Sequence, residues 1–378
     1  MSVPSFTIGI EEEFQAVDRQ TGQLRSCIYT LLEEGRPFFG ERLQSEWVQS
    51  MIELTSGICP TISIARDELY HQRAQLAQLM QKNRLSLISA GTHPTSLWYD
   101  QEKTNKKRYI ELEEEFQDVV RARVLFGLHV HIGVESREIA IELINQLRTW
   151  LPHLLAISSN SPFWVGRFTG IKSYRSVVWQ SGAPRSGLPE IIPSLNDFNT
   201  YVQELIATDC ITSGKDIWWY IRPHPVYNTI EFRICDMPAT IEDSLAIAAL
   251  CQALVAKLAW LHEHNVAVPV LPRDYIEENT WRAMRYGLDA KLADFIHHRS
   301  MSMRDSIHEL LDFVSDVVDD QGSQREMHFL RALLQDERGT GADRQIAVYK
   351  QTNDVRQVIH FLIDQTMEGV THSPVIQY

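Results

Sequence analysis

Carboxylate and imidazole groups recur at every second residue in several short segments of the chain. The residues with this spacing are Glu11, Glu13, Glu53, His129, His131 and Glu231, and Arg233 follows in the same alternation. Because successive side chains of a β-strand point to opposite faces, each segment predicts a strand with one polar and one aliphatic face. Carboxylate oxygens and imidazole nitrogens are common ligands of divalent cations. We therefore predict that several strands contribute side chains to one shared metal site.

The chemical types of these groups favour Mg²⁺ as the cation. Mg²⁺ prefers carboxylate oxygens and is usually held by a few protein ligands together with the phosphate oxygens of a substrate, and the imidazoles would also admit Mn²⁺. Arg233 would suit a phosphoryl group that passes through a charged transition state. The alternative is a catalytic zinc site in a hydrolase, with His129, His131 and one glutamate as ligands. A hydrolase of that kind has less need of the arginine.

The alternation predicts the strands that carry these residues at 6–15, 48–55, 126–134 and 230–236. Helical spacing of apolar residues predicts helices at 64–84, 137–156, 244–264, 301–318, 326–334 and 347–367. Strands and helices are mixed at first, and the part from about residue 275 is mostly helical. Strands with one polar face are typical of antiparallel sheets. We therefore predict an α+β fold, with a curved, mainly antiparallel sheet and flanking helices, in a single domain that spans residues 1–378.

Composition and charge restrict the classes of partner. The chain has 49 acidic and 36 basic residues and no long basic run, which argues against nucleic acid. The apolar stretch 244–256 is shorter than the ~20 residues of a membrane-spanning helix, so we expect a buried helix, capped by Thr240 and Asp243, and no membrane partner. The five cysteines form no CxxC pair, and the first residues show no signal-peptide pattern. These features predict reduced thiols in a cytoplasmic protein.

The common nucleotide-binding and nucleophile motifs are missing from the sequence. It contains no P-loop, no strand-linked G-x-G-x-x-G and no G-x-S-x-G. The segment 339–344 (GTGADR) is rich in glycine, and its backbone N–H groups could surround a phosphate, although this composition is more often a simple turn. P-loop, Rossmann and serine hydrolase chemistry are therefore not indicated.

Several sequence blocks, in one order along the chain, resemble the glutamate–cysteine ligase type 2 family, also called the carboxylate–amine ligase family. The blocks are 9–14, 51–55, 91–94, 126–131, 156–163 followed by Gly166, Thr169, Ser173 and Arg175, 219–223, 229–236, 279–283 with 285–288, and 341–345. The resemblance implies a fold similar to the catalytic domain of glutamine synthetase. It also implies ATP as a substrate and the formation of an amide from a carboxylate and an amine through an acyl phosphate. The specific reaction that it implies is the formation of γ-glutamylcysteine, a step of glutathione biosynthesis.

The resemblance further implies two or three Mg²⁺ ions. By analogy with the glutamine-synthetase-like scheme, Glu11, His129 and Glu231 are expected to hold the ion that bridges the nucleotide phosphates. Glu13 and Glu53 are expected to hold an ion near the acyl acceptor. Both reactants are anionic, so cations between them would let them approach each other.

Other residues in the matching blocks are expected to contact the reactants. Arg233 and Arg344 are the expected catalytic cations. Glu12 is excluded from the site, because the alternation places it on the aliphatic face of its strand. The expected contacts to substrate or nucleotide are His93, His131, Arg175, Arg222 and Arg282.

Two positions depart from the family pattern. Phe168 and Tyr220 stand where an aspartate is usual, which puts glutamate and cysteine as the substrates in question. The alternatives are a ligase of another amino acid or small acid and another amine, and a non-catalytic nucleotide-binding relative. We expect small-molecule substrates and a homo-oligomer, a dimer.

Overall fold

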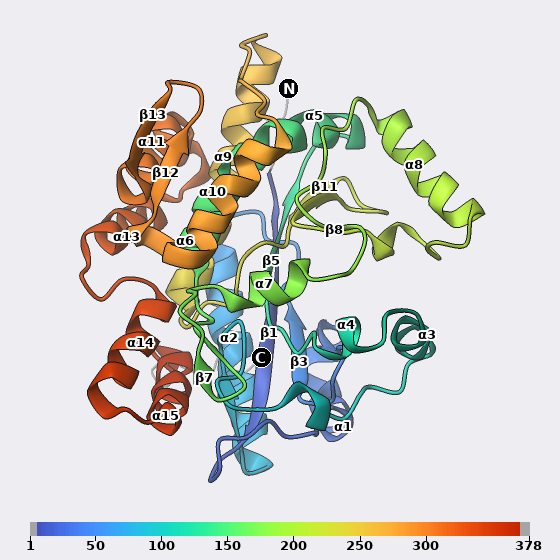
Figure 1. Cartoon of the computed structure of the whole chain (residues 1–378), viewed down its shortest axis with the longest axis vertical. Coiled ribbons are helices and arrows are strands. Elements are labelled where there is room, and N and C mark those ends of the chain that lie inside the picture. The colour runs from blue at the N-terminus through green and yellow to red at the C-terminus, as the bar shows by residue number, and fades with distance from the viewer. Residues whose placement is uncertain (1–5, 371–378) are drawn as a thin grey trace.

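An antiparallel sheet of seven strands forms the centre of the protein, which a computed structural model describes over residues 6–370 (Figure 1). Its strand order is β10–β11–β5–β1–β3–β2, and β4 pairs with β1. The strands are β1 (Ile8–Asp18), β2 (Leu43–Ser45), β3 (Met51–Thr55), β4 (Leu85–Ile88), β5 (Leu128–Gly133), β10 (Ile221–Pro223) and β11 (Thr229–Phe232). All four predicted strands are present. Strands β2, β4 and β10 have only three or four residues each, too few to show an alternating pattern.

Three long helices cover the aliphatic face of this sheet. They are α2 (Ile62–Lys82), α5 (Arg137–Leu147) and α9 (Ile241–Glu263), and α9 contacts α2, α5, β1 and β5. Thr240 and Asp243 form the predicted capping box at the start of α9. This helix is longer than the uncharged stretch suggested. It is apolar and long enough to span a membrane, but 89% of its most apolar window is buried inside the protein. Helix α9 is therefore the central core helix, as predicted.

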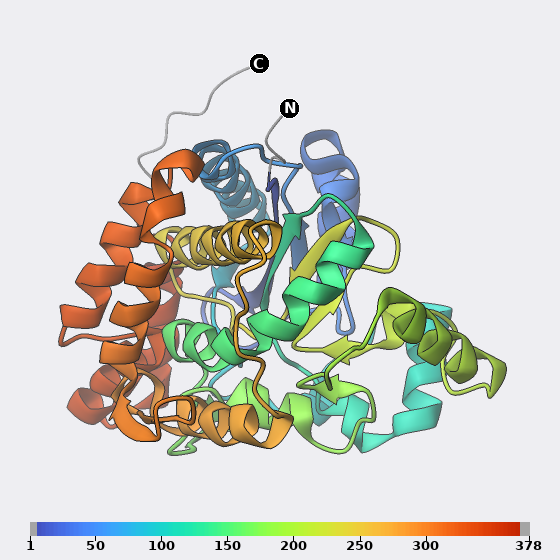
Figure 2. The same cartoon turned by 90° about the horizontal axis from the view of Figure 1, so that it is seen from above.

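The C-terminal part is mostly helical, as predicted. It contains α10 (Arg273–Tyr286), α11 (Met303–Phe313), α12 (Ser315–Gln321), α13 (Gln324–Gln335), α14 (Gly341–Thr352) and α15 (Val355–Thr366), with a hairpin of β12 (Lys291–Asp294) and β13 (Arg299–Ser302). Figures 1 and 2 show these elements, coloured orange to red, together on one side of the molecule. Several predicted helices are split. The 137–156 helix, for example, divides into α5 and α6 (Leu151–Ser158), where Pro152 lacks the N–H that a continuous helix needs.

Shorter elements lie over the polar face of the sheet. They are α3 (Lys107–Phe116), α4 (Asp118–Arg121), α7 (Tyr174–Gln180) and the segment before β9 (Trp218–Trp219), which pairs with β8 (Ser186–Gly187). Helices α1 (Ile28–Phe39) and α8 (Leu195–Ala207) and the small hairpin of β6 (Phe163–Trp164) and β7 (Arg167–Phe168) complete the outer layer. The mixture of a central antiparallel sheet and surrounding helices confirms the α+β prediction. The space between the polar face and its cover contains the candidate site.

Candidate active site

Six of the predicted metal-binding and substrate-binding residues lie on one face of the sheet as cross-strand pairs. The pairs are Glu13–Glu53 between β1 and β3, Glu11–His129 between β1 and β5, and Glu231–His131 between β11 and β5. Directly opposed side chains on the same face of a sheet have Cβ atoms about 5 Å apart. The register therefore brings together groups that lie far apart in the sequence, from Glu11 to Glu231.

These side chains line one cavity of ≈ 340 Å³. Arg222 of β10 and Arg233, which follows β11, line the same cavity. Eight predicted residues are thus brought together. The sequence analysis did not identify the residues that line the cavity from β2 and the cover, chiefly Glu46, Arg108, Tyr109, Arg123, Trp179 and Trp218.

The first group of candidate cation ligands consists of Glu11, His131 and Glu231. One ligand atom from each lies within 4.8 Å of the other two, and we call this group the His131 site. The prediction had His129 in place of His131. The difference arises because the register of β11 against β5 sets Glu231 opposite His131. Carboxylate oxygens with one imidazole fit Mg²⁺ or Mn²⁺.

His129 lies between the two groups of carboxylates. Its Nδ1 atom is 2.9 Å from Oε2 of Glu11, and its Nε2 atom is 3.9 Å from Oε1 of Glu13. Burial and, to a smaller extent, the positive charge of Arg233 lower the pKa of His129 to about 4, so the ring is neutral at pH 7. If Nδ1–H donates to Glu11, Nε2 presents a lone pair towards Glu13. His129 then suits an ion held by Glu13 better than one held by Glu231.

A second set of carboxyl groups that line the cavity consists of Glu13, Glu46 and Glu53, which we call the acidic site. The pKa of Glu13 is raised to about 7; burial is the main cause, the charge of Arg175 opposes the rise, and the charge of Glu46 contributes to it. Burial also raises the pKa of Glu53 well above its usual value, and the charge of Glu46 raises it further. The phenol of Tyr109 donates a hydrogen bond of 3.1 Å to Oε2 of Glu46. A divalent cation would remove the repulsion among these carboxylates, so the donor set fits a second ion.

Two arginines hold the Glu231 carboxylate. Nε and Nη2 of Arg222 donate to its two oxygens at 2.7 and 3.1 Å, and Nη1 of Arg233 also donates to Oε1. Burial alone would raise the pKa of Glu231, but the charges of Arg233 and Arg222 outweigh burial and hold the pKa well below its usual value. Glu231 is therefore a fixed anion whose position is set by both arginines. An ion at the His131 site would share this carboxylate with them.

Four predicted contact residues lie outside the cavity. Arg282 of α10 pairs with Glu278 one turn earlier and donates to the carbonyl of Lys291. His93 is buried, with Nε2 at 2.8 Å from the carbonyl oxygen of Gly22 and Nδ1 accepting from the N–H of Ser96. Both residues thus have structural partners.

Arg175 is buried directly beneath the strand that carries the histidines. Its guanidinium donates to the carbonyls of Arg233 and Ile234, and it fills the space that Gly127 leaves, because a Cβ atom on Gly127 would lie 2.3 Å from Nη2 of Arg175. Arg175 thereby supports the end of β11 and the backbone of Arg233 without lining the cavity.

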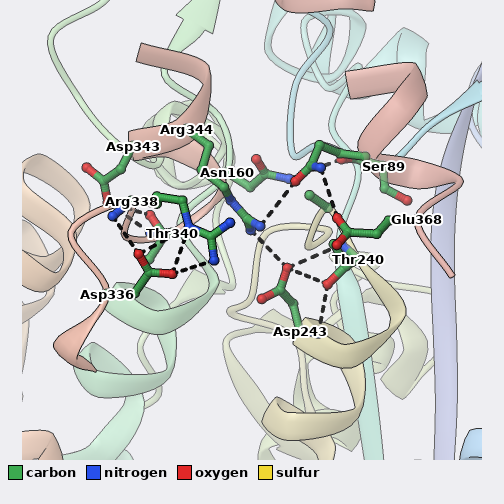
Figure 3. A network of polar contacts seen from close by, with 12 residues as sticks. Ser89, Asn160, Thr240, Asp243, Asp336, Arg338, Thr340, Asp343, Arg344 and Glu368 are labelled. Atoms are coloured by element: carbon green, nitrogen blue, oxygen red, sulfur yellow. Dashed lines mark hydrogen bonds and ion pairs between the residues drawn. The ribbon is translucent and has the colours of Figure 1, made fainter. Parts of the chain in front are cut away.

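Arg344 belongs to a separate polar network (Figure 3). Its Nη2 donates to Oδ2 of Asp243 at 3.0 Å, in the capping box that starts α9. The glycine-rich segment before it is the beginning of α14, where Thr340 and Asp343 form another capping box. A Cβ atom on Gly341 would lie 2.2 Å from Oδ1 of Asn160, so this glycine allows close packing. The segment therefore joins α14 to the core and does not face the cavity.

The two departures from the family pattern also lie outside the cavity. Phe168 is largely exposed on β7 and contacts Phe163. Tyr220 is fully buried, and no hydrogen-bond partner of its hydroxyl is found among residues 6–370. Neither aromatic side chain replaces a group that lines the cavity.

Comparison with known proteins places this chain in a family. A family model for "Glutamate-cysteine ligase family 2(GCS2)" matches residues 7–360. A protein of Solibacter usitatus named "Putative glutamate--cysteine ligase 2" is 47% identical over 368 residues, which are 97% of this chain and 95% of that protein. A protein of Chloroflexus aurantiacus with the same name is 46% identical over 366 residues, covering 97% and 93% of the two chains.

Solved structures show the same fold at low sequence identity. The glutamate–cysteine ligase of Francisella tularensis, in complex with AMP, superposes with a TM-score of 0.73 at 14% identity, covering 98% of this chain and 89% of that chain. The bifunctional glutathione synthetase of Pasteurella multocida gives a TM-score of 0.72 at 12% identity, covering 96% and 52%. With the family match over almost its whole length, the chain belongs to glutamate–cysteine ligase family 2 and is an ATP-dependent carbon–nitrogen ligase.

Proposed function

We propose that this enzyme joins the γ-carboxylate of glutamate to the amine of cysteine through an acyl phosphate. The observation that carries the proposal is that the His131 site, the acidic site and Arg233 line one cavity. The names of the relatives support glutamate and cysteine as the reactants. Phe168 and Tyr220 lie outside the cavity, so these two departures from the family pattern do not argue against glutamate and cysteine as substrates.

In the first step, an oxygen of the substrate carboxylate attacks the γ-phosphorus of ATP, and ADP leaves. Glu11, His131 and Glu231 would hold the Mg²⁺ ion nearest the nucleotide phosphates, and Glu13, Glu46 and Glu53 a second ion nearer the carboxylate. When bound, such ions neutralise the charge of the two anionic reactants and of the transferring phosphoryl group.

Arg233 is the proposed cation at the transferring phosphoryl group. Its side chain is 13% exposed, its backbone is supported by Arg175, and its Nη1 is held by Glu231. A guanidinium fixed in this way meets the developing charge without having to reorganise. Arg222 acts through Glu231 and is a positioning residue, since it is engaged with that carboxylate by two hydrogen bonds.

In the second step, the amine nitrogen attacks the acyl carbon, the phosphate leaves, and the nitrogen loses a proton. Among the described residues, the lining of the cavity includes no serine or cysteine, and its one lysine, Lys215, is exposed. The amide therefore forms directly between the two substrates.

The decisive experiment measures ADP and product together. The enzyme is incubated with ATP, Mg²⁺, glutamate and cysteine, and ADP release is compared with the γ-glutamylcysteine formed, detected by mass spectrometry. We expect one amide per ADP and no continued ADP release over many turnovers unless both substrates are present. Matched reactions with other amino acids test the alternative acids and amines. Substrate hydrolysis without ATP would indicate the hydrolase, and ATP binding without turnover the non-catalytic relative; either result would contradict the proposal.

A further inference from the structure

The part of the cavity opposite the carboxylates contains a cationic group that the proposed phosphoryl transfer does not use. Trp179 of α7 has three arginine guanidinium groups around its indole ring. The Cζ atoms of Arg123, Arg175 and Arg233 lie 4.8, 5.6 and 5.8 Å from the ring centroid. Arg175 is engaged by backbone carbonyls and Arg233 by Glu231. Arg123 remains to be explained.

Arg123 is buried without an anionic partner. The residue is only 8% exposed, and its guanidinium lies between Trp179 and Trp218, 5.1 Å from the second ring centroid. Its only hydrogen bond within the described residues runs from Nη2 to the carbonyl of Trp179 at 3.0 Å, and Nε has no partner. No carboxylate of residues 6–370 forms an ion pair with it, in contrast to Arg108 and Arg222 in the same cavity. Burying an unpaired charge costs free energy unless an anionic group pairs with it.

The surroundings of Arg123 strengthen this conclusion. Burial and, to a smaller extent, the charge of Arg233 lower the pKa of Arg123 to about 10. The two indoles fix the plane of the guanidinium, so its free N–H groups are pre-organised for a planar anion. The guanidinium fork matches the two oxygens of a carboxylate. The phosphates of the nucleotide already have partners at the cation sites and Arg233, so the anion at Arg123 is a different one.

We infer that Arg123, held between Trp179 and Trp218, binds a carboxylate of an amino-acid substrate other than the carboxylate that is phosphorylated. This inference rests on the proposed function and makes it more specific, because it requires a reactant with a second anionic group. The acid or the amine can supply that group. Arg123 then selects α-amino acids over their decarboxylated analogues.

The test compares affinities for matched pairs of compounds. Binding of glutamate against 4-aminobutyrate, and of cysteine against cysteamine, is measured by calorimetry with Mg²⁺ and a non-hydrolysable ATP analogue. The variants are Arg123→Met, Arg123→Lys and the control Arg185→Met, which removes an arginine that also packs on Trp218, 5.8 Å from its ring centroid, but does not line the cavity. Thermal unfolding verifies that each variant is folded.

We expect the wild-type enzyme to prefer the carboxylated member of one pair. Arg123→Met should weaken binding of that member by about 10- to 100-fold, the usual range for a hydrogen bond to a charged group, and leave its analogue within about threefold. Arg123→Lys should lose less, and Arg185→Met nothing. The pair that loses its preference identifies the acid or the amine as the source of the carboxylate.

Equal losses for both members of each pair, no loss, or no preference in the wild-type enzyme would overturn the inference. The proposed function fails in a different way. If the wild-type enzyme releases no ADP while its carboxylate preference still depends on Arg123, the ligase reaction is refuted and the binding site stands.

Discussion

Oε1 of Glu12 lies 2.6 Å from Nη2 of Arg73, and both side chains are buried between β1 and α2. The hydroxyl of Ser244 on α9 donates to the same oxygen at 2.8 Å. Glu12 therefore faces away from the cavity, as its position in the alternation predicted. It is not a neutral position, however, because its carboxylate joins three elements of the fold, β1, α2 and α9.

Replacing Glu12 should therefore lower the stability of the folded protein. Glu12→Gln leaves the buried Arg73 without its anion, and we expect the free energy of unfolding to fall by about 3–5 kcal/mol. Urea denaturation followed by circular dichroism measures this loss. The double variant Glu12→Gln/Arg73→Met should recover part of it, since no unpaired charge remains. A stable single variant would show that the ion pair contributes little.

Replacing Glu53 should stabilise the metal-free protein and at the same time lower its activity. Its raised pKa means that the carboxyl ionises less readily in the folded protein than in the unfolded chain. At pH 7.5, Glu53→Gln should therefore raise the Tm of the metal-free protein while it lowers ligase activity by about 100-fold or more. The exposed Glu337→Gln serves as a matched control and should change neither quantity. Full activity in Glu53→Gln would show that the reaction does not need a Glu53 carboxylate at the acidic site.

Arg344 should matter for the fold and not for the reaction. It pairs with Asp243 at the start of the core helix α9 and does not line the cavity. We expect Arg344→Met to lower the free energy of unfolding by about 1–3 kcal/mol, with kcat and KM of the folded fraction unchanged. Active-site titration with a tight-binding nucleotide analogue corrects for unfolded protein. A selective fall in kcat would restore Arg344 as a catalytic residue.

The polar faces of the strands could be read from the sequence because the pleat fixes them. Glu11 and Glu13 must point the same way whatever surrounds β1, so the alternation sufficed to predict the face. It did not reveal the register between strands. The register depends on which residues of β11 and β5 pair. It places His131 beside Glu231, where the sequence analysis had expected His129.

The residues that cover the cavity show no alternating pattern in the sequence that would have identified them. Glu46 follows a strand of three residues, and Arg123 lies between α4 and β5 in a segment without periodicity. Family resemblance also failed to separate contacts to reactants from contacts within the fold. Arg175 and Gly127 both match the family pattern, and in the structure Arg175 fills the space that Gly127 leaves. Gly341 also matches the pattern, and Asn160 packs against it.

The two histidines should differ in their effect on nucleotide binding. His131 belongs to the His131 site with Glu231, whereas His129 has its Nε2 towards Glu13. We expect His131→Asn to weaken Mg²⁺-dependent binding of an ATP analogue by about 10-fold or more, and His129→Asn to change it by less than about threefold. Fluorescence titration with a labelled nucleotide measures both. The reverse order would support the original assignment of His129 to this ion.

The contribution of Glu13 to the stability of the metal-free protein should fall as the pH rises towards neutrality, and Mg²⁺ should reverse this loss. The pKa of Glu13 is about 7 in the folded protein against an ordinary value of 4.5. Between these values the unfolded chain has released the proton that the folded protein still holds, so ionisation favours unfolding, and this cost grows up to pH 7. A cation requires the ionised carboxylates and offsets their repulsion. The increase in Tm caused by Mg²⁺ should therefore be small at pH 5 and large at pH 7.5, as measured by scanning calorimetry. Glu13→Gln should flatten this dependence, and a Tm increase independent of pH would show that the ion does not displace protons from the acidic site.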